Sequence, residues 1–250
     1  DLHSFPTRRS SDLWQTPMVH IGALERTATE LNLELVAVAA EPFAVARAVL
    51  GTDESPNYTA ILCDVGGGST DIAVVNDGGV EGTKCFGVAG RSFTKTISGD
   101  LSIGYEAAEK LKLNIDGGKI KPNVLRTVNE SIDNTLDVWI SGVQLALSEF
   151  DAIDHLPNKF LLCGGGSSLG ALVDRLETSN WYKDLPFSRR PIIKHVRPSD
   201  VSGIEDETGE ITDHTLITAL GLLRVGYDTM ESVTGTKETF RDKIDRVLRI

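Results

Sequence analysis

The feature that most constrains this 250-residue chain is one stretch over residues 61–75, Ile-Leu-Cys-Asp-Val-Gly-Gly-Gly-Ser-Thr-Asp-Ile-Ala-Val-Val. It is typical of a buried strand that ends at Asp64, a sharp turn, and a second strand that leaves the turn. Three successive glycines, Gly66, Gly67 and Gly68, occupy the turn. Because glycine has no Cβ to obstruct the approach, the backbone N–H groups of such a turn can point inward around an anion.

Polar residues flank these glycines on both sides. The hydroxyls of Ser69 and Thr70 can add donors to a bound anion, and Asp64 is placed to hold a hydrated Mg²⁺ through water. A tight hairpin with a glycine bulge explains three glycines alone. It does not explain the Asp before them and the Ser-Thr-Asp after them. The combination therefore favours a phosphate-binding turn.

A second glycine turn, Gly-Gly-Gly-Ser-Ser, follows a short apolar strand expected over residues 159–163 and opens a helix expected over 169–176. A strand-to-helix turn is a common place for a nucleotide, since N–H groups at a helix N-terminus attract anions and polar edges. No Gly-Lys-Ser/Thr follows it, so it is not a Walker loop, and it is not a G-x-G-x-x-G fingerprint in its usual context. The candidate nucleotide-binding residues of this turn are Gly164, Gly165, Gly166 and Ser167.

The second turn also allows a different interpretation. Its segment Gly166-Ser-Ser-Leu-Gly170 matches the G-x-S-x-G pattern of a hydrolase nucleophile elbow, with Ser168 as the nucleophile. Asp206 and His214 follow in the order that such a triad requires. However, this acid and this base are only eight positions apart, and a serine hydrolase leaves the first glycine turn unexplained.

The rest of the chain alternates between strand and helix patterns. Strands are expected over 33–39, 58–65, 70–75, 80–88, 159–163 and, at an edge, 191–196, with a hairpin at Asn76-Asp77-Gly78-Gly79. Helices are expected over 17–31, 43–50, 93–101, 105–113, 124–150, 169–176 and 215–230. This alternation indicates an α/β protein.

Composition excludes several classes of function. The net charge is −11 and no long basic block is present, which argues against nucleic acid as a partner. The longest apolar runs are too short to span a bilayer. The three cysteines do not make a disulfide framework, and Cys63 and Cys163 end apolar strands, where they are expected as small buried side chains. A reducing cytoplasm fits this cysteine usage.

The first thirteen residues, Asp-Leu-His-Ser-Phe-Pro-Thr-Arg-Arg-Ser-Ser-Asp-Leu, have no apolar periodicity. They back-translate codon for codon into a sequencing-library adapter, so residues 1–13 are expected to be an adapter-derived, disordered artefact and are excluded from fold reasoning. We therefore expect the true N-terminus to be missing.

Taken together, four segments resemble the actin-like ATPase superfamily, which includes actin, the large heat-shock chaperones and sugar kinases. Residues 64–71 are similar to its second phosphate motif, residues 164–169 to its adenosine motif, and residues 39–46 and 219–226 to its two connecting segments. The resemblance implies an α/β, actin-like (ribonuclease H-like) ATPase fold, N-terminally truncated, with a mixed sheet flanked by helices.

The resemblance also implies ATP and Mg²⁺ as cofactors and a role for each matching residue. Asp64 would organise Mg²⁺ and its waters, and Glu41 would orient the hydrolytic water. The β- and γ-phosphates would lie against Gly66, Gly67, Gly68, Ser69 and Thr70. The adenosine would lie against Gly164, Gly165, Gly166 and Ser167, with Glu109 and Lys112 of an E-x-x-K helix beside the adenine and ribose. For Glu41 the plain alternative is a polar stop before Pro42.

Within the superfamily, residues 90–112 resemble the FtsA family of bacterial division proteins, and the PilM pilus-assembly family has similar spacing there. The FtsA resemblance implies self-association into filaments or dimers and a division-protein partner; the PilM alternative implies a pilus partner. A sugar kinase of the same fold is a further alternative. The chain departs from the pattern because no first phosphate motif and no inserted domain are found, so the resemblance does not by itself make this chain an active ATPase.

This resemblance divides the chain. After the artefact at 1–13, residues 14–57 would be a remnant of a first domain, 58–212 a second nucleotide-binding domain, 213–232 a connecting helix that returns to the first domain, and 233–250 a hinge and tail. Phe240, Ile244, Val247 and Leu248 fall on one helix face among basic residues. Residues 239–250 are expected either to contact the membrane, which implies a cytoplasmic protein peripheral on its inner face, or to dock on their own domain.

Overall fold

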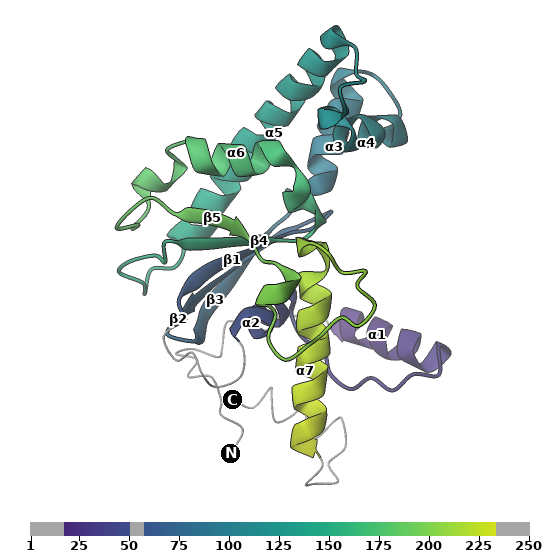
Figure 1. Ribbon diagram of the computed structural model, residues 1–250, viewed down its shortest axis with the longest axis vertical. Helices are drawn as coiled ribbons and strands as arrows, with labels where there is room; N and C mark the ends of the chain where they lie inside the picture. The colour runs from purple at the N-terminus through teal and green to yellow at the C-terminus, as the bar shows by residue number, and fades with distance from the viewer. Residues whose placement is uncertain (1–17, 51–57, 234–250) are drawn as a thin grey trace.

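The computed structural model describes residues 18–50 and 58–233. Its strands are β1 (Ala60–Val65), β2 (Thr70–Asn76), β3 (Gly79–Phe86), β4 (Lys159–Cys163) and β5 (Ile192–His195). Its helices are α1 (Met18–Glu30), α2 (Glu41–Leu50), α3 (Gly90–Asp100), α4 (Tyr105–Leu113), α5 (Pro122–Ser148), α6 (Gly170–Thr178) and α7 (Ile217–Val233). The sheet lies between α5 and α6 on one side and α2 and α7 on the other (Figure 1).

The sheet is mixed, as the resemblance implied. Its strand order is β3-β2-β1-β4-β5, with antiparallel pairs on the β3 side and parallel pairs on the β5 side. The predicted hairpin is confirmed, since Asn76 pairs with Gly79 across the turn. β5 is an edge strand, as the sequence predicted, and β3 forms the other edge.

Both faces of the sheet are covered, so β1 is buried along its whole length. Ile61 and Cys63 point into one apolar cluster with residues of α3, α5 and α6, whereas Leu62 points into another with residues of α2 and α7. Alternate residues of a strand face opposite sides, so one short strand contributes to both clusters. Cys63 and Cys163 are fully buried free thiols, as expected.

Helices α2 and α7 cross very closely below the sheet. A Cβ built on Gly221 of α7 would lie 2.0 Å from the carbonyl oxygen of Ala44 in α2, so only glycine fits there. Asp228 of α7 pairs with Arg47 of α2 and, at 2.9 Å, with the buried Arg224. Helix α2, which precedes the first glycine turn in the chain, is thereby joined to the last described helix.

One predicted strand is wrong. Residues 33–39 run as irregular chain and pair with none of the five strands, and Leu33 and Val38 are 64% and 42% exposed. Apolar alternation indicates a strand, but a strand also needs a neighbouring backbone to hydrogen-bond with. The helix after it begins at Glu41 rather than Phe43, because Pro42 is tolerated in the first turn of a helix.

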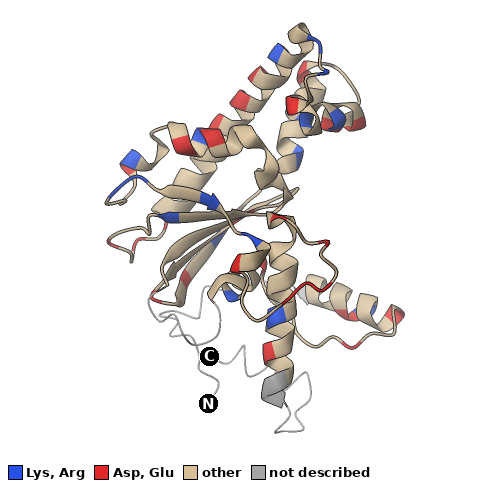
Figure 2. Cartoon of the chain, viewed as in Figure 1, with Lys and Arg blue, Asp and Glu red and all other residues tan. Residues whose placement is uncertain are grey.

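Charges are distributed unevenly over the elements (Figure 2). Asp and Glu gather in the loop before α7, whereas Lys and Arg are dispersed. Within residues 18–50 and 58–233, no helix is both long enough and apolar enough to cross a membrane. The predictions for residues 1–13 and for the amphipathic tail at 239–250 lie outside the described residues.

Candidate functional site

The two glycine turns meet at the carboxyl ends of the neighbouring strands β1 and β4. β1 and β4 are parallel neighbours, with Asp64 opposite Cys163, so the turns that follow them leave from the same edge. A Cβ built on Gly166 would lie only 2.6 Å from the carbonyl oxygen of Gly66. The fold therefore brings together the two turns that the sequence analysis selected, and it joins them by backbone packing.

The first turn is closed by a hydrogen bond from the Gly66 N–H to the Ser69 carbonyl oxygen at 3.0 Å. The half-buried Ser69 hydroxyl donates to Asp71 at 3.1 Å. The Thr70 hydroxyl is fully buried, donates to the Val88 carbonyl oxygen at 2.8 Å and accepts from the indole of Trp139. Both Ser69 and Thr70 were predicted to donate to a bound anion, but the Thr70 hydroxyl already donates to a protein group and is buried within the fold.

Asp64 lies at the end of β1 between the two turns and is 7% exposed. One carboxylate oxygen accepts a hydrogen bond from the Thr218 hydroxyl of α7, and the other lies where a side chain on Gly164 would be, 2.1 Å from a Cβ built there. Burial raises the pKa of Asp64, Asp71 raises it further, and the Thr218 hydrogen bond opposes both. The site therefore holds a carboxylate whose charge is only partly compensated by protein.

Thr218 was missed by the sequence analysis. The signal was present, because it is a hydroxyl residue at the start of an otherwise apolar helix, directly before the segment at 219–226 that resembles a connecting motif. The contact spans most of the chain, and only tertiary structure brings α7 against the end of β1.

Glu41 belongs to the same electrostatic group, although it comes from the start of α2. Partial desolvation raises its pKa, and the negative charges of Asp71 and Asp64 raise it further. Within the described part of the chain, no three His, Cys, Asp or Glu side chains converge closely enough to hold a metal ion directly. The arrangement instead suits a hydrated cation near the three carboxylates.

Glu109 and Lys112 join α4 to the start of α3. The Lys112 ammonium lies 2.9 Å from the Glu109 carboxylate and donates to the Gly90 carbonyl oxygen, also at 2.9 Å. Partial burial would raise the pKa of Glu109, but hydrogen bonds from Thr94 and Lys112 outweigh it and lower that pKa. Because the Gly90 N–H donates to the Gly66 carbonyl oxygen at 3.1 Å, this pair is tied to the first turn.

The second turn is held by its own polar contacts. Gly164 has a left-handed backbone with φ of 79°, and the buried Ser167 hydroxyl donates to its carbonyl oxygen at 2.7 Å. His195 hydrogen-bonds through Nε2 to the Ser167 carbonyl oxygen at 3.0 Å. Gly165 is exposed, and a Cβ built on it would meet nothing within 4 Å. Gly165 is therefore open to a ligand, whereas Gly164, Gly166 and Ser167 are packed.

Of the contacts that a serine-hydrolase triad needs, only the one between its serine and its histidine is present among the described residues. Ser168 Oγ and His214 Nε2 lie 3.0 Å apart, and the His214 ring stacks on His195 with 3.8 Å between centroids. Asp206, however, accepts hydrogen bonds within its own loop, from Thr208 and from the Ile211 N–H. Ser168 is also absent from the described residues with positive φ, so it lacks the strain of a nucleophile elbow. The triad is therefore not assembled.

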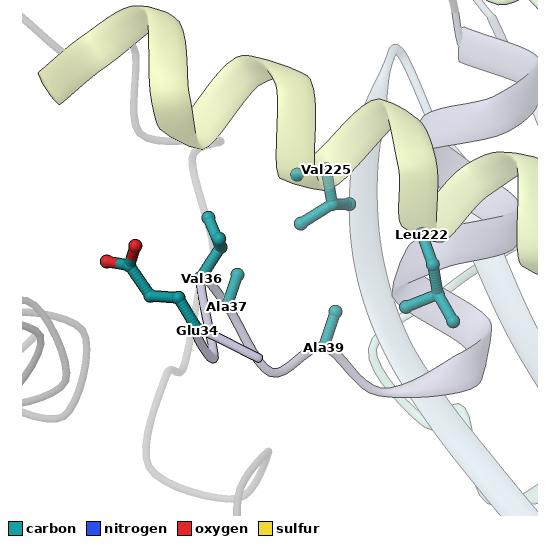
Figure 3. A pocket seen from close by; sticks show the side chains of 7 residues that line it. Glu34, Val36, Ala37, Ala39, Leu222 and Val225 are labelled. Carbon is teal, nitrogen blue, oxygen red and sulfur yellow. The ribbon is translucent and has the colours of Figure 1, made fainter. Parts of the chain in front are cut away.

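A separate hollow of about 280 Å³ lies between residues 34–39 and α7 (Figure 3). It is lined mainly by small apolar side chains, with Glu34 as its one charged residue. Such a lining has few polar groups to orient a nucleotide. The hollow is therefore not a rival to the site at the glycine turns.

Comparisons with known proteins show the family of this chain. The family model described as "Cell division protein FtsA" matches residues 61–221. FtsA of Buchnera aphidicola is 26% identical over 223 residues, which cover 78% of this chain and 50% of that protein. FtsA of Bacillus subtilis is 36% identical over 89 residues, which cover 36% of this chain and 20% of that protein. The chain thus spans half the length or less of these relatives.

Two solved structures have the same fold. The PilM–PilN type IV pilus biogenesis complex matches 82% of this chain and 57% of its own, with a TM-score of 0.63 and 20% identity. MreB5 of Spiroplasma citri bound to ADP matches 90% of this chain and 69% of its own, with a TM-score of 0.54 and 18% identity. At these identities the likeness establishes the actin-like ATPase fold alone. With the family match over residues 61–221, the chain belongs to the FtsA family of the actin-like ATPase superfamily.

Proposed function

We propose that the chain supplies the second phosphate motif and the adenosine motif of an ATP site in an FtsA-type cell division protein. The observation that carries this proposal is that the first turn contains glycines that the fold itself does not require. Gly67 and Gly68 are not among the described glycines with positive φ, and the atoms nearest a Cβ built on either belong to the Arg91 side chain, at 3.4 Å or more, so the backbone does not require glycine at these two positions. Glycines that the fold does not need are expected where a ligand must approach the backbone closely.

The carboxylates fit a magnesium ion in this site. Oxygen donors suit Mg²⁺, and burial, together with the neighbouring carboxylates, raises the pKa of Asp64 and of Glu41, so a cation there would stabilise their charged forms. Asp64 would hold the ion through its waters, since direct coordination by three side chains is not built. When bound, Mg²⁺ supplies charge neutralisation for the phosphates. Glu41 would then accept a hydrogen bond from the attacking water and orient it.

The remaining predicted residues receive supporting roles in this proposal. The open face at Gly165, with Gly166 and the buried Ser167 behind it, would receive the adenosine. Gly164 would act indirectly, by leaving room for Asp64. Glu109 and Lys112 would border the ribose while holding α4 against α3.

At the level of the cell, we propose a division scaffold that binds ATP, self-associates into filaments or dimers and hydrolyses ATP slowly at most. Its place would be the cytoplasm, peripheral on the inner face of the membrane, with contact through residues 239–250. A PilM-like role as a pilus-assembly adaptor is the second candidate, favoured by the likeness to the PilM–PilN complex. The family match over residues 61–221 favours division.

Calorimetric titration of the full-length protein with ATP, with and without Mg²⁺, tests the nucleotide proposal. Asp64→Asn removes the charge at the centre of the site, and Asp154→Asn makes the same change on the exposed loop before β4. We expect Asp64→Asn to abolish the Mg²⁺-dependent part of ATP binding and Asp154→Asn to leave it unchanged. Equal Mg²⁺ dependence in wild type and Asp64→Asn would contradict the role of Asp64, and absence of ATP binding by the wild type would contradict the whole proposal.

A further inference from the structure

An arginine that the sequence analysis did not select lies against the first glycine turn. Arg91 is the second residue of α3, and its N–H donates to the Gly67 carbonyl oxygen at 2.7 Å. Its guanidinium Nε would lie 3.4 Å from a Cβ built on Gly67, and one Nη would lie 3.7 Å from a Cβ built on Gly68. The cationic group thus occupies the side of the turn that these two glycines leave open.

This guanidinium has no hydrogen-bond or ion-pair partner among residues 18–50 and 58–233, and the residue is exposed. Arg175, Arg197 and Arg224, by contrast, each pair with an aspartate at 2.9 to 3.0 Å. Acidic side chains are near the turn, because Asp64 and Asp71 flank it, yet Arg91 pairs with neither. A cation that lies beside a backbone turn and has no protein partner among the described residues is available to an external anion.

We propose that Arg91 is a phosphate-binding residue that contacts the terminal phosphates of the nucleotide, a role that rests on the ATP site proposed above. A guanidinium presents parallel N–H donors that match two phosphate oxygens, which an ammonium cannot do. It would also offset the negative charge of Asp64 and Asp71 beside the phosphates. Arg91 would therefore favour nucleotides with more than one phosphate over a monophosphate.

Calorimetric titration of the full-length protein with MgATP, MgADP and AMP tests this role. Arg91→Gln removes the charge, Arg91→Lys keeps the charge without the fork, and Arg126→Gln on α5 is a matched control with an exposed arginine. We expect Arg91→Gln to weaken MgATP and MgADP about tenfold or more and AMP by less than about twofold. Arg91→Lys should recover only part of the loss, and Arg126→Gln should match the wild type. Thermal unfolding of all variants should coincide, because the Arg91 side chain makes no hydrogen bond or ion pair with the described residues.

The outcomes separate this inference from the function on which it rests. If the wild type binds MgATP and Arg91→Gln binds it equally well, Arg91 is not a phosphate residue and the ATP site stands. The same conclusion follows if Arg91→Gln weakens AMP as much as MgATP, since the loss would then be a general effect on the turn. If the wild type binds no nucleotide, the ATP site and the role of Arg91 both fail.

Discussion

The two glycine turns have nearly the same sequence and opposite structural demands. In the second turn, Gly164 has a φ of 79° and a Cβ on it would collide with the Asp64 carboxylate, while a Cβ on Gly166 would collide with the Gly66 carbonyl oxygen. In the first turn, a Cβ on Gly67 would meet only the Arg91 side chain at 3.4 Å, and one on Gly68 the same side chain at 3.7 Å.

Two kinds of glycine are therefore present. Those of the second turn allow close packing within the protein, whereas Gly67 and Gly68 of the first turn leave the backbone accessible to a ligand. Gly164 and Gly166 let two strand ends and a carboxylate pack without side chains between them. Gly67 and Gly68 are exposed, and the fold does not fill the space beside them with backbone. Substitutions in the second turn should therefore act on stability, whereas those in the first turn should act on ligand binding.

The largest expected effect is on the stability of Gly164→Ala. The new methyl group would overlap the Asp64 carboxylate, and alanine at positive φ adds backbone strain. We expect a loss of about 3 kcal/mol or more in the free energy of unfolding, measured by urea denaturation. Gly165→Ala, one residue away with nothing within 4 Å of its Cβ, is the matched control and should change it by about 0.5 kcal/mol or less. Equal losses of stability in Gly164→Ala and Gly165→Ala would contradict the inference that close packing requires glycine at position 164.

Much of this region could be predicted because its signals are local. The apolar run before Asp64, the glycines after it and the Asn-Asp-Gly-Gly hairpin each determine a few neighbouring residues, and β1, β2 and β3 follow them closely. The segment at 33–39 was predicted wrongly, because alternation does not specify a pairing partner. The contact of Thr218 with Asp64 could not be read from spacing, since it depends on how α7 packs against the sheet.

The next largest effect should be on binding, with Gly67→Ala. Its φ is not positive and the neighbouring Arg91 side chain can shift, so the free energy of unfolding should change by about 0.5 kcal/mol or less. The methyl group would, however, stand on the open side of the proposed phosphate turn. We expect MgATP affinity to fall about tenfold or more in calorimetric titration. Gly87→Ala, which also meets nothing within 4 Å, should leave affinity unchanged. A destabilised Gly67→Ala with normal affinity would reverse the assignment of the two turns.

A smaller effect is expected from Thr218→Val, which tests the residue between the turns. Valine keeps the shape of threonine and removes the hydroxyl that donates to Asp64, which leaves a buried carboxylate less satisfied. We expect a loss of about 1 to 2 kcal/mol in urea denaturation and a further rise in the pKa of Asp64. Thr127→Val on α5, where the hydroxyl bonds only to its own helix, is the control for valine in a helix. An unchanged stability for Thr218→Val relative to Thr127→Val would show that α7 does not support Asp64.

The smallest expected effect is on the pH dependence of stability, through His214 beside the second turn. Burial lowers the pKa of His214 below its ordinary value of 6.5, the stacked His195 lowers it further, and Asp213 opposes both. The unfolded chain therefore takes up this proton at a higher pH than the folded chain, so stability should decrease as pH falls through about 6.5 toward the lowered value. The raised pKa values of Asp64 and Glu41 act in the opposite direction, which makes the comparison with a histidine variant necessary.

Between pH 7.5 and 5.5, the wild type should lose up to about 1 kcal/mol of its free energy of unfolding through His214, as measured by urea denaturation. His214→Gln should remove that part of the pH dependence, because glutamine does not titrate. His155→Gln, on the exposed loop before β4, should retain it. Since His214 bonds to Ser168 and its carbonyl oxygen accepts from the Gly164 N–H at 3.1 Å, a confirmed difference would mean that acid loosens the packed turn. Identical pH profiles for the wild type and His214→Gln would mean that protonation of His214 does not affect the stability of the protein.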